Sequence, residues 1–268
     1  MDYILKTNPD GSVITIRDVQ HVLLGMLKDI DTLCRKHNIP YFLNGGSALG
    51  AVRHHGFIPW DDDADIAMMR SDYEKLLKVV HELGDRYVAH AFAFNKKYNV
   101  LIPAMKIRKK GTYIKEINPL LANKIKDCDG LFVDVFVYDY VNPHKLLDLP
   151  LRLLNQGLMP IIAFFENVRW NPVLLKRWFM ANAKFYGWLN RGSSMIGMDI
   201  TWTFKAALKP FVFKKDDIYP LQRVPFEDVE LPIPSHPHEY LCTMIAPSYM
   251  TPPPEDKRVA KHIADISL

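Results

Sequence analysis

Four aspartates fall within five positions of the sequence: Asp61, Asp62, Asp63 and Asp65. They follow the apolar run FIPW and lead directly into the apolar run IAM. Carboxylates held a few ångströms apart repel one another unless a cation neutralises them or one of them is protonated. Oxygen ligands of this kind suit Mg²⁺ or Mn²⁺. The cluster therefore indicates a metal site, and a solvated acidic turn at the edge of a sheet is the simpler alternative.

The residues around the cluster predict that two of its acids converge. The stretch DADIAMM, residues 63–69, is expected to form a strand, in which side chains two positions apart point to the same face. Asp63 and Asp65 then share one face, while Ala64 and Ile66 turn towards the core. A metal held by this pair would leave room for substrate phosphates.

A glycine pair precedes the acids. Residues 41–43 are expected to form a short buried strand, and a short helix is expected from Ser47, as N-cap, to Gly56. Glycine lets the backbone approach a ligand closely, and a helix N-terminus offers N–H groups to phosphate. Gly45, Gly46 and Ser47 are therefore the candidate phosphate site beside the metal pair, although a lone Gly-Gly is usually a turn.

A third acid lies in the apolar run GLFVDVFVYDYV, residues 130–141. An unpaired carboxylate inside such a strand would be costly, so Asp134 is expected to complete the acidic site. Asp139, at the end of the same run, is interpreted as structural.

Three cations are candidates for contact with phosphate. Arg53 lies just past the glycine pair and pairs well with phosphate, but a solvated helix end is an equal alternative. Lys106 and Arg108 alternate with apolar residues, so they share one face of a strand. That face either meets phosphate or is exposed to water.

The elements that must position these residues alternate between helix and strand, which predicts a mixed α/β (α+β) fold with a mixed sheet flanked by helices. A strong amphipathic helix is expected from residue 19 to about 38, and Ser71 and Glu74 have the spacing of a capping box. Strands are expected in residues 87–94, 99–117 and 130–141. We expect residues 1–144 to form the catalytic core. Residues 145–268, helical and aromatic-rich and then proline-rich, would pack on that core on the acceptor side.

Composition limits the partners. The chain has 268 residues, 49% of them hydrophobic, which is enough for a large core. Its net charge of +4 suits phosphorylated ligands or an anionic membrane surface, but is too small to indicate a nucleic-acid partner. Cys34, Cys128 and Cys242 lack CxxC spacing, so we expect reduced thiols in a cytosolic protein without zinc.

Membrane association is expected to be peripheral at most. The most apolar window, Leu149 to Phe165, is interrupted by polar residues and Pro160, and so falls short of the ~20 apolar residues of a membrane span. The N-terminal residues MDYILKTNPDG lack the order of a signal peptide. We expect a cytoplasmic protein, with the inner face of the membrane as its furthest location.

Three segments carry a resemblance to a known family. Residues 41–68, YFLNGGSALGAVRHHGFIPWDDDADIAM, closely resemble the LicD family of the nucleotidyltransferase fold. Residues 130–141 look like that family's second acidic strand. DDIYPLQRVPFEDVELPIPSHPHEYL and SYMTPPPEDKR are similar, more loosely, to its C-terminal segment. No motif of the family is seen between about residues 145 and 205.

The resemblance implies an enzyme that transfers phosphocholine from CDP-choline to a glycan hydroxyl of teichoic acid or lipopolysaccharide type, including a lipid-linked acceptor, with release of CMP. It implies Mg²⁺, or Mn²⁺, on Asp63 and Asp65, with Asp134 as third carboxylate. Asp134 would be the general base or would share the metal. Donor phosphates would lie against Gly45, Gly46 and Ser47. Arg53 and Lys106 are candidate phosphate contacts from their own positions in the sequence and not from the resemblance.

Other functions remain open at this level. The same motifs fit a nucleotidyltransferase that releases pyrophosphate, a transferase of another phosphoalcohol such as ribitol phosphate, or a nucleotide-binding pseudoenzyme. Aromatic residues at helical spacing in the second half usually fill a core, but are also suited to a choline cage or, with nearby basic residues, to an anionic bilayer. These aromatics are Phe164, Phe165, Trp170, Trp178, Tyr186, Trp188 and Trp202.

Overall fold

The computed structural model describes residues 3–117, 125, 127–142, 145–198 and 211–268. Its helices are α1 (Ile16–Lys36), α2 (Gly45–His54), α3 (Arg70–Val79), η1 (Val80–Leu83), α4 (Lys145–Asn167), α5 (Val173–Leu189), α6 (Lys215–Ile218), α7 (Pro237–Met244) and η2 (Glu255–Lys257). Its strands are β1 (Ile4–Thr7), β2 (Val13–Thr15), β3 (Phe42–Leu43), β4 (Asp65–Met69), β5 (Tyr87–Ala91), β6 (Met105–Lys109), β7 (Tyr113–Glu116), β8 (Phe132–Val141), β9 (Met195–Met198), β10 (Val212–Lys214), β11 (Gln222–Phe226), β12 (Val229–Ile233) and β13 (Ile263–Ser267).

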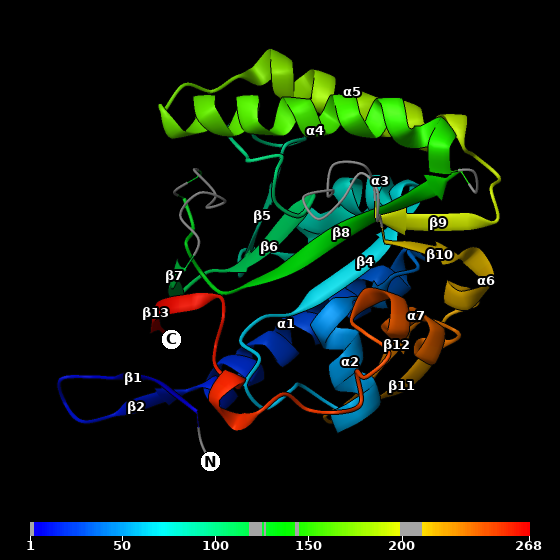
Figure 1. The fold of residues 1–268 in the computed structure, drawn as a ribbon. Helices are drawn as coiled ribbons and strands as arrows, with labels where there is room; N and C mark the ends of the chain where they lie inside the picture. The colour runs from blue at the N-terminus through cyan, green and yellow to red at the C-terminus, as the bar shows by residue number, and fades with distance from the viewer. Residues whose placement is uncertain (1–2, 118–124, 126, 143–144, 199–210) are drawn as a thin grey trace.

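A mixed sheet runs through the middle of the molecule, and helices flank it (Figure 1). Its order is β10-β9-β8-β4-β3, and β6 also pairs with β8 and carries β5. β4 and β8 run parallel, whereas β3, β6 and β9 pair antiparallel to their neighbours. This confirms the predicted mixed α/β fold. β8 is central because its first half pairs with β6 and its second half with β9.

The predicted amphipathic helix is confirmed as α1. Its apolar residues recur at helical spacing and are buried in the main core, including Leu23, Leu27 and Ile30. The helix starts with a capping box in which Thr15 and Asp18 bond each other's backbone N–H. The capping box expected at Ser71 is wrong, because α3 begins at Arg70 and has no side-chain cap.

The proline-rich region near the C-terminus contains a hairpin that the sequence analysis did not predict. β11 and β12 pair antiparallel and form a separate two-stranded sheet. Pro225 and Pro232 lie within these strands. A strand with one unpaired edge tolerates proline, because the missing N–H can face away from the partner.

The second half of the chain shares its sheets with the first. β9 and β10 extend the main sheet beyond β8, and β13 pairs with β7. α4 and α5 form a long hairpin that lies above the sheet in Figure 1. Among the described residues, no helix combines the length and the apolar character required to cross a bilayer. The three cysteines are free, as expected.

Candidate functional site

The glycine pair forms the first turn of α2 and does not precede the helix. The helix begins at Gly45, after Asn44 in the N-cap position, so the prediction of Ser47 as N-cap is wrong. Gly45 has a φ of 52°, a backbone conformation that suits glycine. Ser47 lies in the first turn, where its Oγ accepts a hydrogen bond from the N–H of Asp65 (2.9 Å). The serine thus joins the helix start to the start of β4.

Two tyrosines fix the position of Asn44. The hydroxyl groups of Tyr138 and Tyr240 both donate to Asn44 Oδ1, at 3.1 and 2.8 Å. The Tyr240 hydroxyl also accepts the N–H of Gly45 (3.1 Å). Asn44 is buried, and among the described residues its Nδ2 has no hydrogen-bond partner. A buried donor therefore stands beside the first turn of α2.

The two glycines bring this turn against the acidic cluster. A Cβ atom added at Gly45 would lie 3.5 Å from Asp65 Oδ2, and one at Gly46 would lie 2.9 Å from Asp61 Oδ2. The second distance is shorter than side chains normally tolerate. The absence of a side chain at Gly46 is therefore what allows the helix N-terminus to meet the carboxylates.

Two of the three predicted metal ligands lie side by side in the sheet. In the parallel pairing of β4 with β8, Asp65 lies opposite Asp134. β4 begins only at Asp65, so Asp63 precedes the strand and does not share its ladder as predicted. The carboxylate of Asp63 instead contacts His262, with 3.1 Å between Oδ2 and Nε2.

Burial raises the pKa of these acids, and their mutual repulsion adds to the rise. The pKa of Asp61 and of Asp65 lies well above the ordinary value because both are largely removed from water and because Asp63 is close. Burial also raises the pKa of Asp63. It raises the pKa of Asp134 to about 6, against the opposing effect of the Lys106 charge. Acids that resist ionisation together fit a site that a cation completes.

Asp62 differs from its neighbours. It is 2% exposed, and its carboxylate accepts three backbone N–H groups, from Lys261 (3.1 Å), His262 (3.0 Å) and Ile263 (2.8 Å). It therefore anchors the C-terminal segment, and the alternative of a solvated acidic turn does not hold for this residue. Sequence reasoning missed His262 and Lys261. The charged run EDKRVAKH was the available signal, but it gave no spacing to the acids.

Lys106 and Arg108 are buried, so the exposed-face alternative for them is wrong. Lys106 lies opposite Asp134 in the register, and its Nζ is 3.0 Å from Asp134 Oδ1 and 3.3 Å from the centre of the Phe132 ring. Arg108 donates to Glu116 (2.5 Å) and to the carbonyl of Gly130 (2.9 Å). Lys106 is thus at the site as the counter-charge of Asp134, and its contact with phosphate stays a prediction.

Arg53 connects α2 to the C-terminal segment. Its Nη1 donates to the carbonyl of Tyr249 (2.6 Å), and its guanidinium lies 6.0 Å from the ring of Trp60. Arg258 lies 5.1 Å from the same ring. Burial, together with the charge of Arg258, lowers the pKa of Arg53. Asp61 is near enough to oppose that shift, so Arg53 lies beside the acids, and its role towards phosphate stays a prediction.

The acids fit a divalent cation by type of ligand. Within the described residues, no three histidine, cysteine or acidic side chains converge closely enough to hold a metal ion as they stand. Asp63 and Asp134 have His262 and Lys106 as their present partners. The donor set is nevertheless one of carboxylate oxygens, buried at Asp134 and partly buried at Asp63 and Asp65, which is the type of ligand that Mg²⁺ accepts. Asp63, Asp65 and Asp134 remain the predicted ligands.

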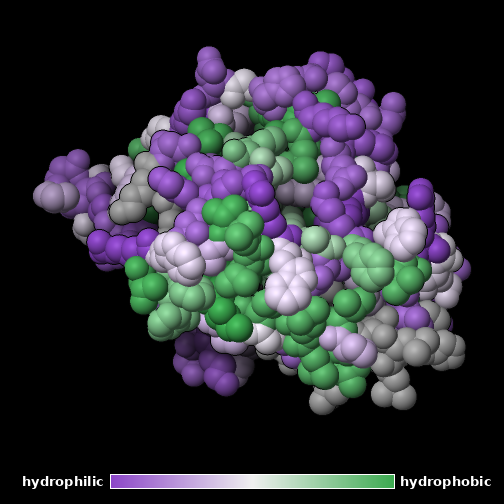
Figure 2. Space-filling model, turned by 90° about the horizontal axis from the view of Figure 1, so that it is seen from above, coloured by the Kyte–Doolittle hydropathy of each residue, from purple (hydrophilic) through white to green (hydrophobic). Residues whose placement is uncertain are grey.

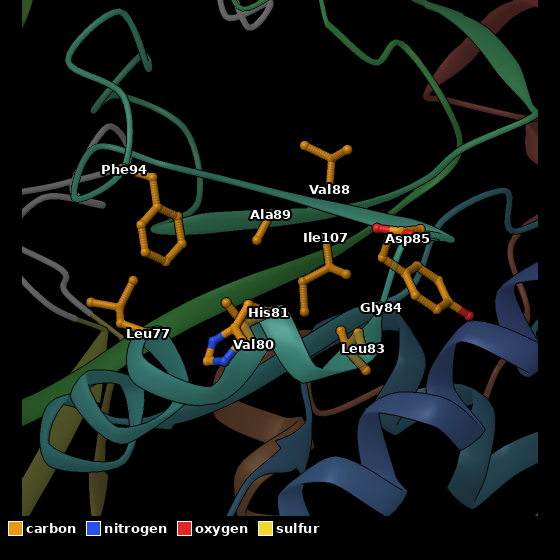
Figure 3. A pocket seen from close by; sticks show the side chains of 11 residues that line it. Leu77, Val80, His81, Leu83, Gly84, Asp85, Val88, Ala89, Phe94 and Ile107 are labelled. Atoms are coloured by element: carbon orange, nitrogen blue, oxygen red, sulfur yellow. The ribbon is translucent and has the colours of Figure 1, made fainter.

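A cavity of about 350 Å³ lies elsewhere, between η1 and the strands β5 and β6 (Figure 3). Apolar side chains such as Leu77, Val80 and Phe94 line it together with His81 and Asp85. None of the clustered acids borders it. The candidate site lies at the acids because carboxylates with raised pKa values meet a helix N-terminus there, and such groups indicate chemistry better than hollow volume does.

The aromatic residues of the second half divide between interior and surface. Tyr186 is buried, with the Arg152 guanidinium 5.4 Å from its ring centre. Phe164, Trp170, Trp178 and Trp188 are exposed, so the expectation of a core position is wrong for these four. Trp202 lies outside the described residues.

Comparison with known proteins confirms the resemblance seen in the sequence. The family model of the LicD/FKTN/FKRP nucleotidyltransferase domain matches residues 38–144. The lipopolysaccharide cholinephosphotransferase LicD of Haemophilus influenzae is 33% identical over 145 residues, which cover 52% of this chain and 49% of that protein. An uncharacterized protein of Rickettsia prowazekii is 36% identical over 78 residues, 29% of each chain. One of Rickettsia typhi is 43% identical over 67 residues, 24% of this chain and 22% of the relative. The matched segments thus span about half or less of each relative.

Proposed function

Residues 38–144 match the nucleotidyltransferase domain of the LicD family, and on that basis we propose that the chain transfers phosphocholine from CDP-choline to a glycan hydroxyl. The acceptor would be of teichoic acid or lipopolysaccharide type, and CMP would be released. The printed activity of the Haemophilus influenzae relative, a lipopolysaccharide cholinephosphotransferase, supports this choice of reaction.

The observation that carries the proposal is the meeting of a helix N-terminus with paired acids. Asp65 and Asp134 lie opposite each other in adjacent strands, and Gly45 and Gly46 bring the first turn of α2 into contact with the cluster. A helix N-terminus favours the phosphates of a nucleotide donor. The buried Nδ2 of Asn44 offers a further donor beside that turn. Phosphoryl transfer needs this combination of anion binding and carboxylates.

The residues would share the work as follows. Asp63 and Asp65 would hold Mg²⁺, which would neutralise charge on the donor diphosphate. The hydroxyl oxygen of the acceptor forms a bond to the phosphorus that carries choline, and the bond from that phosphorus to the CMP oxygen breaks. Asp134 would either complete the metal ligands with Asp63 and Asp65 or accept the hydroxyl proton as general base.

A nucleotidyltransferase reaction with release of pyrophosphate is the second candidate, because the family model that matches is itself named for a nucleotidyltransferase domain. The two reactions use the same acids and differ in the bond that breaks. Their products therefore distinguish them.

The test is to incubate the full chain with Mg²⁺, CDP-choline and a lipopolysaccharide acceptor, and to measure CMP and pyrophosphate. CMP release that needs the acceptor, and that Asp134→Asn abolishes, would support the proposal. Asp228→Asn is the matched control, since Asp228 is an exposed acid paired with Lys28. Pyrophosphate release from CTP, without CMP release from CDP-choline, would replace phosphocholine transfer with nucleotidyl transfer.

Ligand binding gives a readout that needs no acceptor. A ligand at ~100 times its Kd stabilises the fold by about 2.7 kcal/mol, which is several degrees in Tm for a chain of this size. We expect this shift with CDP-choline and Mg²⁺, and expect Asp63→Ala/Asp65→Ala to lose it. CDP-ribitol and CDP-ethanolamine in the same panel would identify another phosphoalcohol.

A further inference from the structure

The outer face of the α4–α5 hairpin is apolar and exposed among the described residues. On α5, Leu174 (78% exposed), Trp178, Phe185 and Trp188 (66% exposed) recur at helical spacing and form one stripe. On α4, the stripe contains Leu153, Ile161 and Phe164 (60% exposed), and Val168 continues it just past the end of the helix. Figure 2 looks down on this side of the molecule and shows hydrophobic and pale residues gathered in a band across it. Apolar patches of this extent mark interaction surfaces.

The inner face of the hairpin is already filled. Phe179 packs in a buried cluster with residues of α4 and with Val100 and Leu101. Lys176 forms a buried ion pair with Glu166 and donates to the carbonyl of Tyr98 (3.0 Å). The hairpin is therefore held in place from beneath, and its outer stripe is not needed to build the core.

Between residues 149 and 191, where the side chains of the hairpin are described, the exposed charges are all positive. They are Arg169, Arg177, Lys184 and Arg191. The acid of this range, Glu166, is buried against Lys176. At 100° per residue, Arg177 and Lys184 border one side of the apolar stripe of α5. Lys184 also pairs with Glu74 of α3 (3.0 Å).

We propose that this face, the outer surface of α4 and α5, rests on an anionic lipid bilayer. Tryptophan and phenylalanine beside arginine and lysine, on helices parallel to a surface, suit the boundary between headgroups and acyl chains. A second copy of the chain is disfavoured because it would bring like charges together. This inference does not depend on the proposed transfer reaction.

The test is flotation of the full chain with vesicles of phosphatidylcholine alone or mixed with phosphatidylglycerol. We expect binding to the mixed vesicles that weakens as salt is raised. Arg177→Gln/Arg191→Gln should weaken that binding by roughly fivefold per arginine. Leu174→Ser/Trp188→Ser should weaken it by roughly tenfold or more on the same vesicles.

The matched control is Ile4→Ser/Val13→Ser, which removes exposed apolar residues from the β1–β2 hairpin, far from α4 and α5 in Figure 1. It should bind as the wild type does. Tryptophan fluorescence of the wild type supplies a readout without substitutions, because insertion of Trp178 and Trp188 should shift the emission to the blue.

The proposal is overturned if the wild type does not float with the mixed vesicles at low salt. It is also overturned if the hairpin variants bind those vesicles as well as the control variant does. A dimer in sedimentation velocity that the hairpin variants lose, without any vesicle binding, would assign this face to a second copy. Loss of CMP release in the transfer assay, with vesicle binding intact, would count against the proposed function alone.

Discussion

Ionisation of single acids in the cluster opposes folding, because burial and neighbouring carboxylates disfavour the charged form. The raised pKa of Asp65 means that this group stabilises the folded chain most at low pH, and that the contribution is lost as the pH rises through its folded value. Asp65→Asn should therefore raise the Tm in EDTA near neutral pH. The gain is expected because the amide carries no charge that the neighbouring carboxylates repel.

The control for this stability measurement is Asp228→Asn, which removes a surface acid from an ion pair and should leave the Tm nearly unchanged. A lower Tm for Asp65→Asn in EDTA would mean that the Asp65 carboxylate stabilises the apoprotein, and that repulsion does not dominate there.

Asp62 gives the opposite prediction, because its carboxylate is satisfied. Asp62→Ala leaves three backbone N–H groups of residues 261–263 without their acceptor, of which that of Ile263 is buried. We expect a loss of about 2–4 kcal/mol in the free energy of unfolding, measured in urea, and faster amide exchange in that segment. Asp62→Asn keeps one acceptor oxygen and should lose less. Equal stability of Asp62→Ala and wild type would refute the anchoring role.

Among single residues, the sequence indicates Asp65 and Asp134 because a carboxylate among apolar strand residues is costly to bury without a partner. It does not indicate His262 or Tyr240. His262 lies 200 positions from its partner Asp62 in the sequence, and Tyr240 lies 196 positions from Asn44. No periodicity links positions so far apart, and only the folded chain brings them together.

Among the elements, α2 depends on Gly46. Gly46→Ala would place a methyl group 2.9 Å from Asp61 Oδ2 and displace that carboxylate. We expect the variant to fold, but to show a smaller Tm shift with CDP-choline and Mg²⁺. The comparison is Gly25→Ala in α1, where an added Cβ meets nothing within 4 Å. Gly25→Ala should gain about 0.5–1 kcal/mol from reduced backbone entropy. A similar gain at Gly46, with ligand binding intact, would contradict the contact.

Elements with a clear period are the ones that the sequence predicts well. α1 and β8 match their expected ranges closely, since each has an apolar pattern of its own. The N-cap of α2 is Asn44, three residues before the predicted Ser47. Serine is a typical N-cap, but the Ser47 hydroxyl instead accepts the N–H of Asp65. The sequence analysis missed β11 and β12 because proline usually argues against a strand, although a strand with an unpaired edge accepts it.

At the scale of the whole molecule, the boundary expected near residue 145 can be tested directly. β9 pairs with the second half of β8, and Ile196, Phe213 and Tyr240 belong to the main core. We expect residues 1–144 alone to lack a cooperative thermal transition by circular dichroism. Without β9 and these core residues, part of the main core would be exposed to water. A cooperative melt of the fragment would show an independent domain.

The sequence could not predict which side of the hairpin faces water. The periodic aromatics of α4 and α5 fit a core equally well, since a helix with an apolar stripe gives no sign of what covers it. In the structure, residues of the opposite face, such as Ile162 and Phe179, form a buried cluster, and the aromatic stripe is exposed.

The link from Tyr240 to Asn44 has a consequence for biosynthesis. The two residues are 196 positions apart, and Asp62 bonds Ile263 across 201 positions. A ribosome making this chain therefore releases the acids and the glycine turn long before the residues that secure them. Until residues 240–263 emerge, Asn44 and Asp62 lack these partners, and the acids of the cluster remain hydrated. Activity should therefore appear late in translation, as a single event, rather than grow with chain length.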